Sequence, residues 1–137
     1  MKKVLFVFAI AFAAAFPAWS QTNESQAEKN RLNGAWELLS GQPLPKGTRD
    51  IKIISGGHFI FVAYDTQNGK PLYTGGGTFV LNGTSYTEHV DFMSDQISAG
   101  MIGKDQTFTV KVDGEYFTQT GVLSSGKSLS EVWKRLK

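Results

Sequence analysis

Among the residues that could take part in chemistry, Glu88 stands out because it falls on the apolar side of a predicted strand, residues 84–93. A lone carboxylate in an apolar interior costs several kcal/mol unless it is paired or protonated. We therefore expect Glu88 to be held protonated or to have a hydrogen-bonding partner. The polar side chains that share its predicted interior are Tyr86, Gln106 and Gln119.

Three consecutive glycines, Gly75 to Gly77, lie on the strand expected to pair with that of Glu88. If Asn82-Gly83 forms a two-residue turn, Gly77 lies opposite Glu88. Glycine has no side chain, so this register predicts unfilled volume beside the carboxylate. An apolar lining with a few convergent polar groups is typical of a small-ligand pocket. The predicted ligand-binding residues are Tyr73, Gly75, Gly77, Phe79, Tyr86, Glu88, Gln106, Phe108, Phe117 and Gln119.

A structural interpretation of the same residues stays open. Glycines within a strand weaken it and usually mark a bend or a close approach by another group. On that interpretation, Gly75 to Gly77 are the bend that closes the sheet. Glu88 then belongs to an internal hydrogen-bond network, as buried polar groups normally do.

The other reactive residue types form no catalytic constellation. His58 lies beside a predicted turn and His89 on an outer face, and a histidine without partners is more often structural. No spacing of His, Cys, Asp and Glu resembles a closed metal site. Residues 121–124 lack the nucleophile-elbow pattern, and residues 73–77 are not followed by the helix that a phosphate loop needs. We expect no enzyme activity, no catalytic residue, no metal and no cofactor.

The elements that must position these residues are short strands separated by turn signals. Runs rich in Thr, Val, Ile, Phe and Tyr alternate with Gly-containing turns. Sequential hairpins of this kind form an up-and-down antiparallel sheet, and eight such strands close into a barrel. The predicted fold class is therefore an all-β, eight-stranded antiparallel up-and-down barrel. Its strands are expected at residues 34–41, 48–55, 58–65, 72–81, 84–93, 105–113, 115–123 and 128–136.

Alternation along each strand predicts which side chains face the interior. In residues 48–55, Ile51 and Ile53 are expected inside and Lys52 outside. A turn at Asp113-Gly114 places one set of residues inside: Gln106, Phe108, Val110, Phe117 and Gln119. Residues 58–65 stay open between two sets, which are His58, Ile60, Val62 and Tyr64 for an even loop and Phe59 and Phe61 for an odd one.

The first twenty residues are typical of a secretory signal. Lys2 and Lys3 precede an uncharged apolar run, residues 4–16, and Ala18-Trp19-Ser20 places small residues at a cleavage site before Gln21. The run is too short for a spanning helix, and the chain has no Cys for lipid attachment. We expect a cleaved signal peptide at 1–20, a polar leader at 21–33 and one barrel domain at 34–137. The mature protein is expected to be periplasmic or secreted.

Charge excludes two classes of partner. Without Lys2 and Lys3, the chain carries 12 Lys and Arg residues against 12 Asp and Glu residues. No basic run or basic face remains that could bind nucleic acid or an anionic membrane surface. We expect a monomer with no nucleic-acid partner, no membrane span after signal cleavage, and a small hydrophobic ligand as its partner.

Both ends of the predicted sheet carry a family resemblance. Gly34-Ala35-Trp36 resembles the Gly-x-Trp motif that opens lipocalins and fatty-acid-binding barrels, and Arg135 resembles the Arg on their last strand that stacks on that Trp. The interior stretches DIKIISGGHFIFVAYD, GGGTFVLNGTSYTEHV and GKDQTFTVKVDGEYF resemble an uncharacterised family of secreted lipocalin-like (calycin) domains from Bacteroides-type bacteria. The resemblance covers residues 33–137. It implies an eight-stranded barrel, structural roles for Trp36 and Arg135, and a small hydrophobic ligand.

These observations favour a secreted or periplasmic barrel that binds a small hydrophobic or amphipathic molecule in its interior. The alternative is a filled barrel that acts as a protein-interaction module, such as an inhibitor, a chaperone or an envelope factor. Interior volume separates the two: a cavity above about 300 Å³ favours ligand binding.

Overall fold

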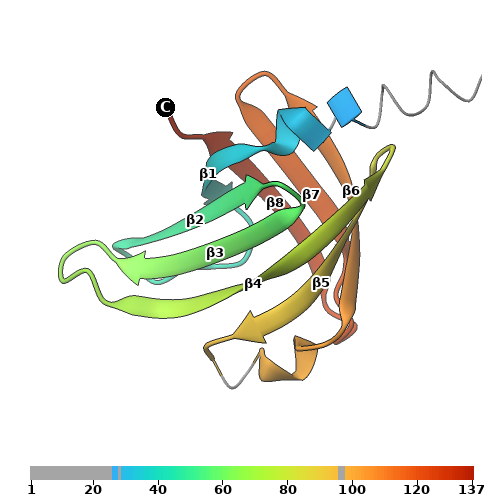
Figure 1. Ribbon diagram of the computed structural model, residues 1–137. Coiled ribbons are helices and arrows are strands. Elements are labelled where there is room, and N and C mark those ends of the chain that lie inside the picture. Colours follow the sequence, from blue (N-terminus) through green and yellow to red (C-terminus); the bar gives the residue numbers. More distant parts are fainter. Residues whose placement is uncertain (1–25, 28, 96–97) are drawn as a thin grey trace, which may run out of the picture.

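Eight strands joined by short turns close into one antiparallel barrel in the computed structural model, which describes residues 26–27, 29–95 and 98–137 (Figure 1). Each strand pairs with the next along the chain, and the last pairs with the first. The predicted fold class is confirmed. The strands are β1 (Gly34–Ser40), β2 (Thr48–Ser55), β3 (His58–Asp65), β4 (Pro71–Asn82), β5 (Ser85–Met93), β6 (Asp105–Asp113), β7 (Tyr116–Val122) and β8 (Ser128–Arg135). A short 3₁₀ helix, η1 (Ala99–Met101), lies between β5 and β6.

Trp36 and Arg135 hold the barrel closed where β1 meets β8. The two residues are cross-strand partners, and the Arg135 guanidinium lies 4.0 Å from the centre of the Trp36 ring. The same guanidinium donates to the carbonyl oxygens of Arg31 and Asn33 at 2.6 and 2.9 Å. A Cβ at Gly34 would overlap this guanidinium, which explains the glycine of the Gly-x-Trp motif. The predicted stack is confirmed.

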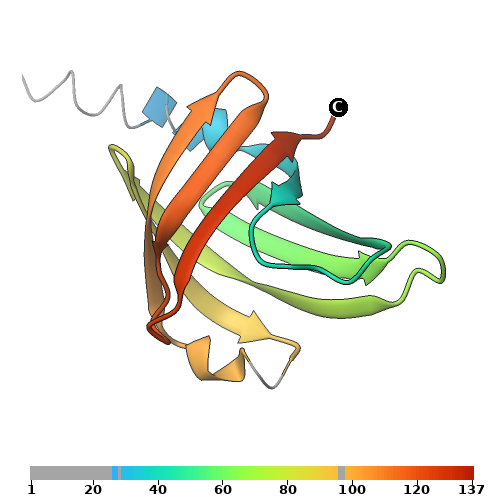
Figure 2. The ribbon, with the colours of Figure 1, turned by 180° about the vertical axis from the view of Figure 1, so that it is seen from behind.

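The two ends of the barrel differ. Residues 29–32 are helical and cover one end, where Leu32 is fully buried and its carbonyl accepts a hydrogen bond from Trp36 Nε1 at 2.8 Å. The opposite end carries η1 and the β7–β8 turn, as both views show (Figures 1 and 2). The predicted signal peptide, residues 1–20, lies outside the described residues. Among the residues that are described, no helix is long and apolar enough to cross a membrane.

The tight hairpins differ from the predicted register by two residues. Leu81 pairs with Tyr86 rather than with Thr84, because the turn residues are Gly83-Thr84 and not Asn82-Gly83. Gly83 has φ 58°, and glycine at the first turn position is what a type II′ turn requires. The β6–β7 hairpin shifts in the same way, with Val112 opposite Phe117. A two-residue shift keeps each side chain on its predicted face, so the interior of these strands is still assigned correctly.

The predicted orientation of β2 is wrong. Lys52 is buried, with 2% of its surface exposed, whereas Ile53 is 47% exposed. Alternation alone favoured an orientation with the isoleucines inside. The observed orientation instead places the Lys52 cation inside, where it pairs with Glu88, as described below. Ser55 pairs with His58 across Gly56-Gly57, so the loop has even length. The set expected inside for an even loop is nevertheless wrong, because it assumed that Ile53 faces in. Ile54 faces in instead, and so does Phe59 opposite it, while Ile60 is 43% exposed.

Gly77 marks a close approach of two strands rather than open space. The register of β4 and β5 shifts between Gly76 and Gly77, and Gly77 lies opposite Val90. A Cβ at Gly77 would overlap the carbonyl oxygen of His89. The predicted pairing of Gly77 with Glu88 is therefore wrong, and the residue opposite Glu88 on β4 is Phe79. The register shift and the close contact at Gly77 favour the structural interpretation of these glycines over the one that leaves ligand space.

Candidate functional site

The barrel interior contains a cavity of about 430 Å³. It lies toward the end that carries η1 and the β7–β8 turn, because its wall includes residues of η1, of that turn and of the adjoining strand ends. Both apolar and charged side chains line it: Gln42, Asp50, Lys52, Phe61, Tyr73, Glu88, Val90, Met93, Asp95, Ser98, Met101, Gln106, Phe108, Gln119, Leu123, Ser125, Lys127, Leu129, Glu131 and Trp133.

Aromatic packing fills the half of the barrel near the short N-terminal helix formed by residues 29–32; we call this half the closed half. Trp36 packs on Phe117 with ring centres 5.5 Å apart, and Phe117 packs edge-on against Tyr86 at 6.4 Å. Tyr86 in turn contacts Phe79 at 5.0 Å. Burying these large rings stabilises the closed half and leaves the remaining volume at the other end.

A buried ion pair forms the floor of the cavity. Lys52 on β2 donates from Nζ to Glu88 Oε1 on β5, and also to Gln119 Oε1 on β7 at 3.0 Å. Both ion-pair side chains are almost fully buried. Glu88 therefore does have a partner, Lys52, which was not among the three residues expected from the sequence. Gln119 contacts the same ammonium group.

Aromatic rings surround the ammonium group of Lys52. Its Nζ lies 5.3–5.9 Å from the ring centres of four residues, which are Phe59, Tyr86, Trp133 and Phe117. Such cation–π contacts offset part of the desolvation cost of a buried cation. Burial, followed by the neighbouring Glu88 carboxylate, raises the pKa of the Tyr86 hydroxyl, so Tyr86 stays neutral.

Asp50 is a second carboxylate in the cavity wall, and among the described residues only one of its two oxygens has a hydrogen-bond partner. It is 3% exposed, and its Oδ2 accepts a hydrogen bond of 2.7 Å from the Tyr73 hydroxyl. The hydroxyl in turn accepts one from Gln42 Nε2 at 3.1 Å. Asp50 Oδ1 is buried and has no hydrogen-bond partner among the described residues. Burial raises the pKa of Asp50, while the bond from Tyr73 and the charge of Lys52 oppose that change.

Glu131 on β8 is a third carboxylate in the wall. It is 6% exposed, and its Oε2 accepts a hydrogen bond from Trp133 Nε1 at 3.2 Å. Burial raises the pKa of Glu131 to about 7. The nearby Lys52 charge lowers it, whereas the carboxylates of Glu88 and Asp50 raise it further.

Stability should therefore fall as pH rises through neutrality. A carboxyl whose pKa is raised on folding binds its proton more tightly in the native state, so the stabilisation is complete below the ordinary value of 4.5 and is lost as pH rises through about 7. Glu131→Gln should remove this loss and raise the free energy of unfolding by about 1–3 kcal/mol at about pH 8. Urea unfolding of both proteins between about pH 5 and 8 measures the effect, with the exposed Asp91→Asn as control. Parallel stability curves for the parent and Glu131→Gln would contradict it.

Gln106 forms two hydrogen bonds with Ser124. Its Nε2 donates to Ser124 Oγ at 2.9 Å, and its Oε1 accepts from the Ser124 backbone amide at 2.7 Å. These two bonds tie the β7–β8 turn to β6. Gln106 lines the cavity, but its amide is already satisfied within the protein.

Half of the predicted ligand-binding residues line the cavity and half do not. Those on its wall are Tyr73, Glu88, Gln106, Phe108 and Gln119. The other five lie elsewhere: Phe79, Tyr86 and Phe117 pack in the closed half, and the two glycines are covered by neighbouring strands. At Gly75, the space that a side chain would take is already filled by Met93 and Phe61.

Sequence reasoning missed the three other charged residues of the interior, Asp50, Lys52 and Glu131. The sequence did contain a signal for this face of the strand. Asp50, Lys52 and Ile54 occupy alternate positions and therefore share one face, just as Ile51 and Ile53 share the other. The buried Glu88 needs a cation, and Lys52 is the one buried cation that the described residues supply. In β8, the spacing of Glu131 and Trp133 places both on one face.

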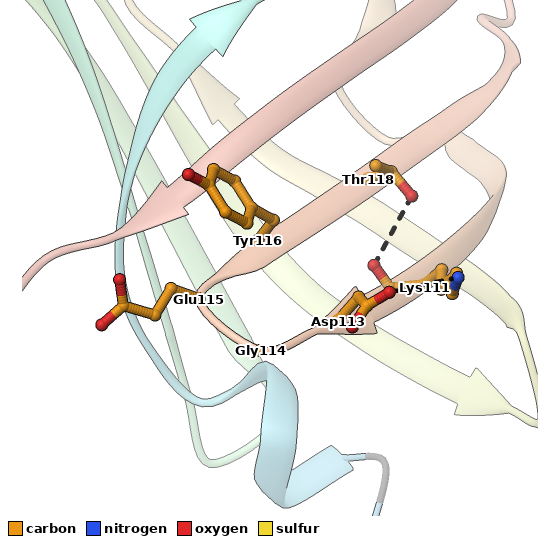
Figure 3. Close-up of a pocket in the computed structure, with 6 residues that line it drawn as sticks. All are labelled: Lys111, Asp113, Gly114, Glu115, Tyr116 and Thr118. Carbon is orange, nitrogen blue, oxygen red and sulfur yellow. Dashed lines mark hydrogen bonds and ion pairs between the residues drawn. The ribbon is translucent and has the colours of Figure 1, made fainter.

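A hollow of about 510 Å³ outside the barrel is a weaker candidate. It is lined by residues of the β6–β7 hairpin alone, and Figure 3 shows their side chains spread along the hairpin rather than converging. Thr118 Oγ1 donates to the Lys111 carbonyl there at 3.5 Å. The histidines offer no alternative site, because both are exposed, with His89 Nδ1 2.7 Å from Asp105 Oδ1. The described residues contain no cluster of His, Asp and Glu suited to a metal ion.

Comparison with known proteins agrees with this architecture. The structure resembles the crystal structure of a lipocalin-like protein from Bacteroides uniformis, with a TM-score of 0.56 and 14% sequence identity over 77% of this chain and 99% of that chain. The lipocalin-like resemblance seen in the sequence is thus confirmed at the level of the fold. No curated protein matches the chain. The model of a family described as a domain of unknown function, DUF4488, matches residues 31–137, so the chain belongs to the DUF4488 family.

Proposed function

We propose that this protein binds a small hydrophobic or amphipathic molecule inside the barrel. The cavity of about 430 Å³ carries the proposal, because it exceeds the roughly 300 Å³ at which small-ligand sites begin. Apolar side chains such as Phe61, Val90 and Leu129 contact the tail of such a ligand, and the carboxylates fix its orientation. The same volume argues against a filled barrel that acts only through its rim. Binding rather than catalysis is proposed, because the described residues of the wall include no histidine and no cysteine.

A neutral fluorophore tests the cavity directly. Prodan, a neutral naphthalene dye that brightens in apolar surroundings, should bind the parent protein. Leu129→Trp places a bulky indole ring in the cavity and should weaken prodan binding at least about tenfold. The matched control is Val80→Trp, since Val80 is 69% exposed and absent from the cavity wall, and it should bind as the parent does. Equal binding by both variants, with both folded, would place the dye elsewhere and refute this site.

Export is part of the same proposal, since the first twenty residues have the pattern of a signal peptide. Native mass spectrometry of protein purified from its own host reports two quantities at once. The mass of the chain should correspond to a start at Gln21, and a retained small molecule should appear as added mass that dissociates on activation. A chain that keeps residues 1–20 would contradict export.

A further inference from the structure

Negative charge exceeds positive charge inside the barrel. Among the described residues, three buried side chains are acidic, Asp50, Glu88 and Glu131, and one is basic, Lys52. The Lys52 ammonium group already donates hydrogen bonds to Glu88 and Gln119. Asp50 and Glu131 therefore line the cavity without an ion-pair partner of their own in the described part of the chain.

Asp50 has an unused acceptor. Its side chain is held by Tyr73 through Oδ2, while Oδ1 is buried without a hydrogen-bond partner among the described residues. A buried acceptor without a hydrogen bond destabilises the protein, and native structures rarely retain one without a functional reason. A ligand N–H group reaching Oδ1 would satisfy it.

The remaining wall also suits a cation. Aromatic rings of Phe61, Tyr73 and Trp133 line the same cavity, and ring faces attract organic cations. An anionic head would meet the carboxylates of Asp50 and Glu131, and Lys52 is already paired. A bare metal ion fits less well, because the described residues provide no cluster of three metal-ligating side chains.

We propose that the ligand of this cavity is a cationic amphiphile, with an amine-bearing head between Asp50 and Glu131 and an apolar body against the rest of the wall. This inference rests on the proposed ligand-binding function and names the chemical class of the ligand. The head donates to Asp50 Oδ1 and forms a charge-assisted bond, which is about twice as strong as a neutral one. The ammonium of Lys52 remains with Glu88 and fixes the floor.

A series of probes with one tail and three heads tests the charge preference. Isothermal titration calorimetry at about pH 8 compares octylammonium, octanol and octanoate on the parent protein. Octylammonium should bind at least about tenfold more tightly than octanol, and octanoate should bind most weakly. Equal affinities for octylammonium and octanol, or tightest binding of octanoate, would overturn the cationic assignment and leave the hydrophobic cavity standing. If neither octanol nor prodan binds, the proposed function itself fails.

Two substitutions test the charge of each carboxylate while keeping an oxygen for its internal hydrogen bond. Asp50→Asn keeps an oxygen that can accept from Tyr73, and Glu131→Gln keeps one for Trp133. Each should weaken octylammonium binding at least about tenfold and leave octanol binding unchanged, and the exposed Asp91→Asn should change neither. Thermal unfolding checks that each variant is folded. If both folded variants bind octylammonium as the parent does, the proposed head position is wrong.

The affinity for octylammonium should also rise with pH as the carboxyls ionise. The groups facing the head from the surrounding strands are Asp50 and Lys52 on β2, Tyr73 on β4, Glu88 on β5 and Glu131 on β8, with Asp95 and Lys127 in the loops of the wall. Glu131 is expected to ionise near neutrality, because its pKa is raised to about 7. Glu131→Gln should therefore flatten the pH profile between about pH 5 and 8. A profile that is unchanged in this variant would contradict a role for Glu131.

Discussion

Lys52→Met should lower the free energy of unfolding by about 3–5 kcal/mol, because it leaves the Glu88 carboxylate buried without its cation. Methionine keeps most of the volume of the lysine stem, so the loss comes from charge rather than from a cavity. Urea unfolding at about pH 7 measures it. Lys111→Met is the matched control: Lys111 is exposed on the outside of β6, and its replacement should change stability by less than about 0.5 kcal/mol.

A double variant identifies the mechanism of that loss. Lys52→Met combined with Glu88→Leu removes both charges and should recover most of the stability, since a buried ion pair can often be replaced by apolar residues of similar volume. If the double variant is as unstable as Lys52→Met alone, the cost does not come from an unpaired Glu88. A parent-like Lys52→Met protein would show that the ion pair has no structural role.

Gly77→Ala should destabilise the barrel by about 3 kcal/mol or more, because the added methyl group has no space. It would overlap the carbonyl oxygen of His89 on the neighbouring strand, and backbone cannot move aside as a flexible side chain can. Thermal and urea unfolding measure the effect. Gly100→Ala is the control: Gly100 has open space around its Cβ position and no positive φ, so its replacement should cost less than about 0.5 kcal/mol.

This second prediction also decides between the two sequence interpretations of the glycines. If they leave ligand space, a larger residue at position 77 gives a folded protein that has lost prodan binding. If they form the bend that closes the barrel and need glycine there, the variant is unstable whatever the cavity holds. The geometry at Gly77 supports the latter. A Gly77→Ala protein with the parent's melting temperature would contradict it.

On the proposed function, the two halves of the barrel divide structural and binding roles. Apolar rings and the Trp36–Arg135 stack occupy the half near the N-terminal helix, where burial of large aromatic area supplies stability. The other half holds the carboxylates and the open volume. Lys52 lies between them and contacts aromatic rings as well as Glu88. Stability and ligand chemistry should therefore respond to different substitutions, except at Lys52 and Glu131.

The sequence by itself determined the fold class, the strand boundaries and the contact between the first and last strands. Turn residues and two-residue alternation are local signals, and they remain visible in the chain without knowledge of its partners. The Gly-x-Trp motif and Arg135 added one long-range contact, which the structure confirms. Glu88 was also recognised as an interior carboxylate, because its neighbours on alternate positions are apolar.

Only the tertiary structure decided what Glu88 contacts and where the volume lies. Strand β2 has plausible apolar residues on both faces, and the choice between Ile53 and Lys52 depends on a carboxylate 36 positions away. The turn at Gly83 moved each predicted pair by two residues, which preserved faces but exchanged neighbours. The position of the cavity depends on which large aromatic side chains fill one half of the barrel, and that depends on the packing of all eight strands together. Charge pairing and packing of this kind are long-range properties, and alternation along one strand does not contain them.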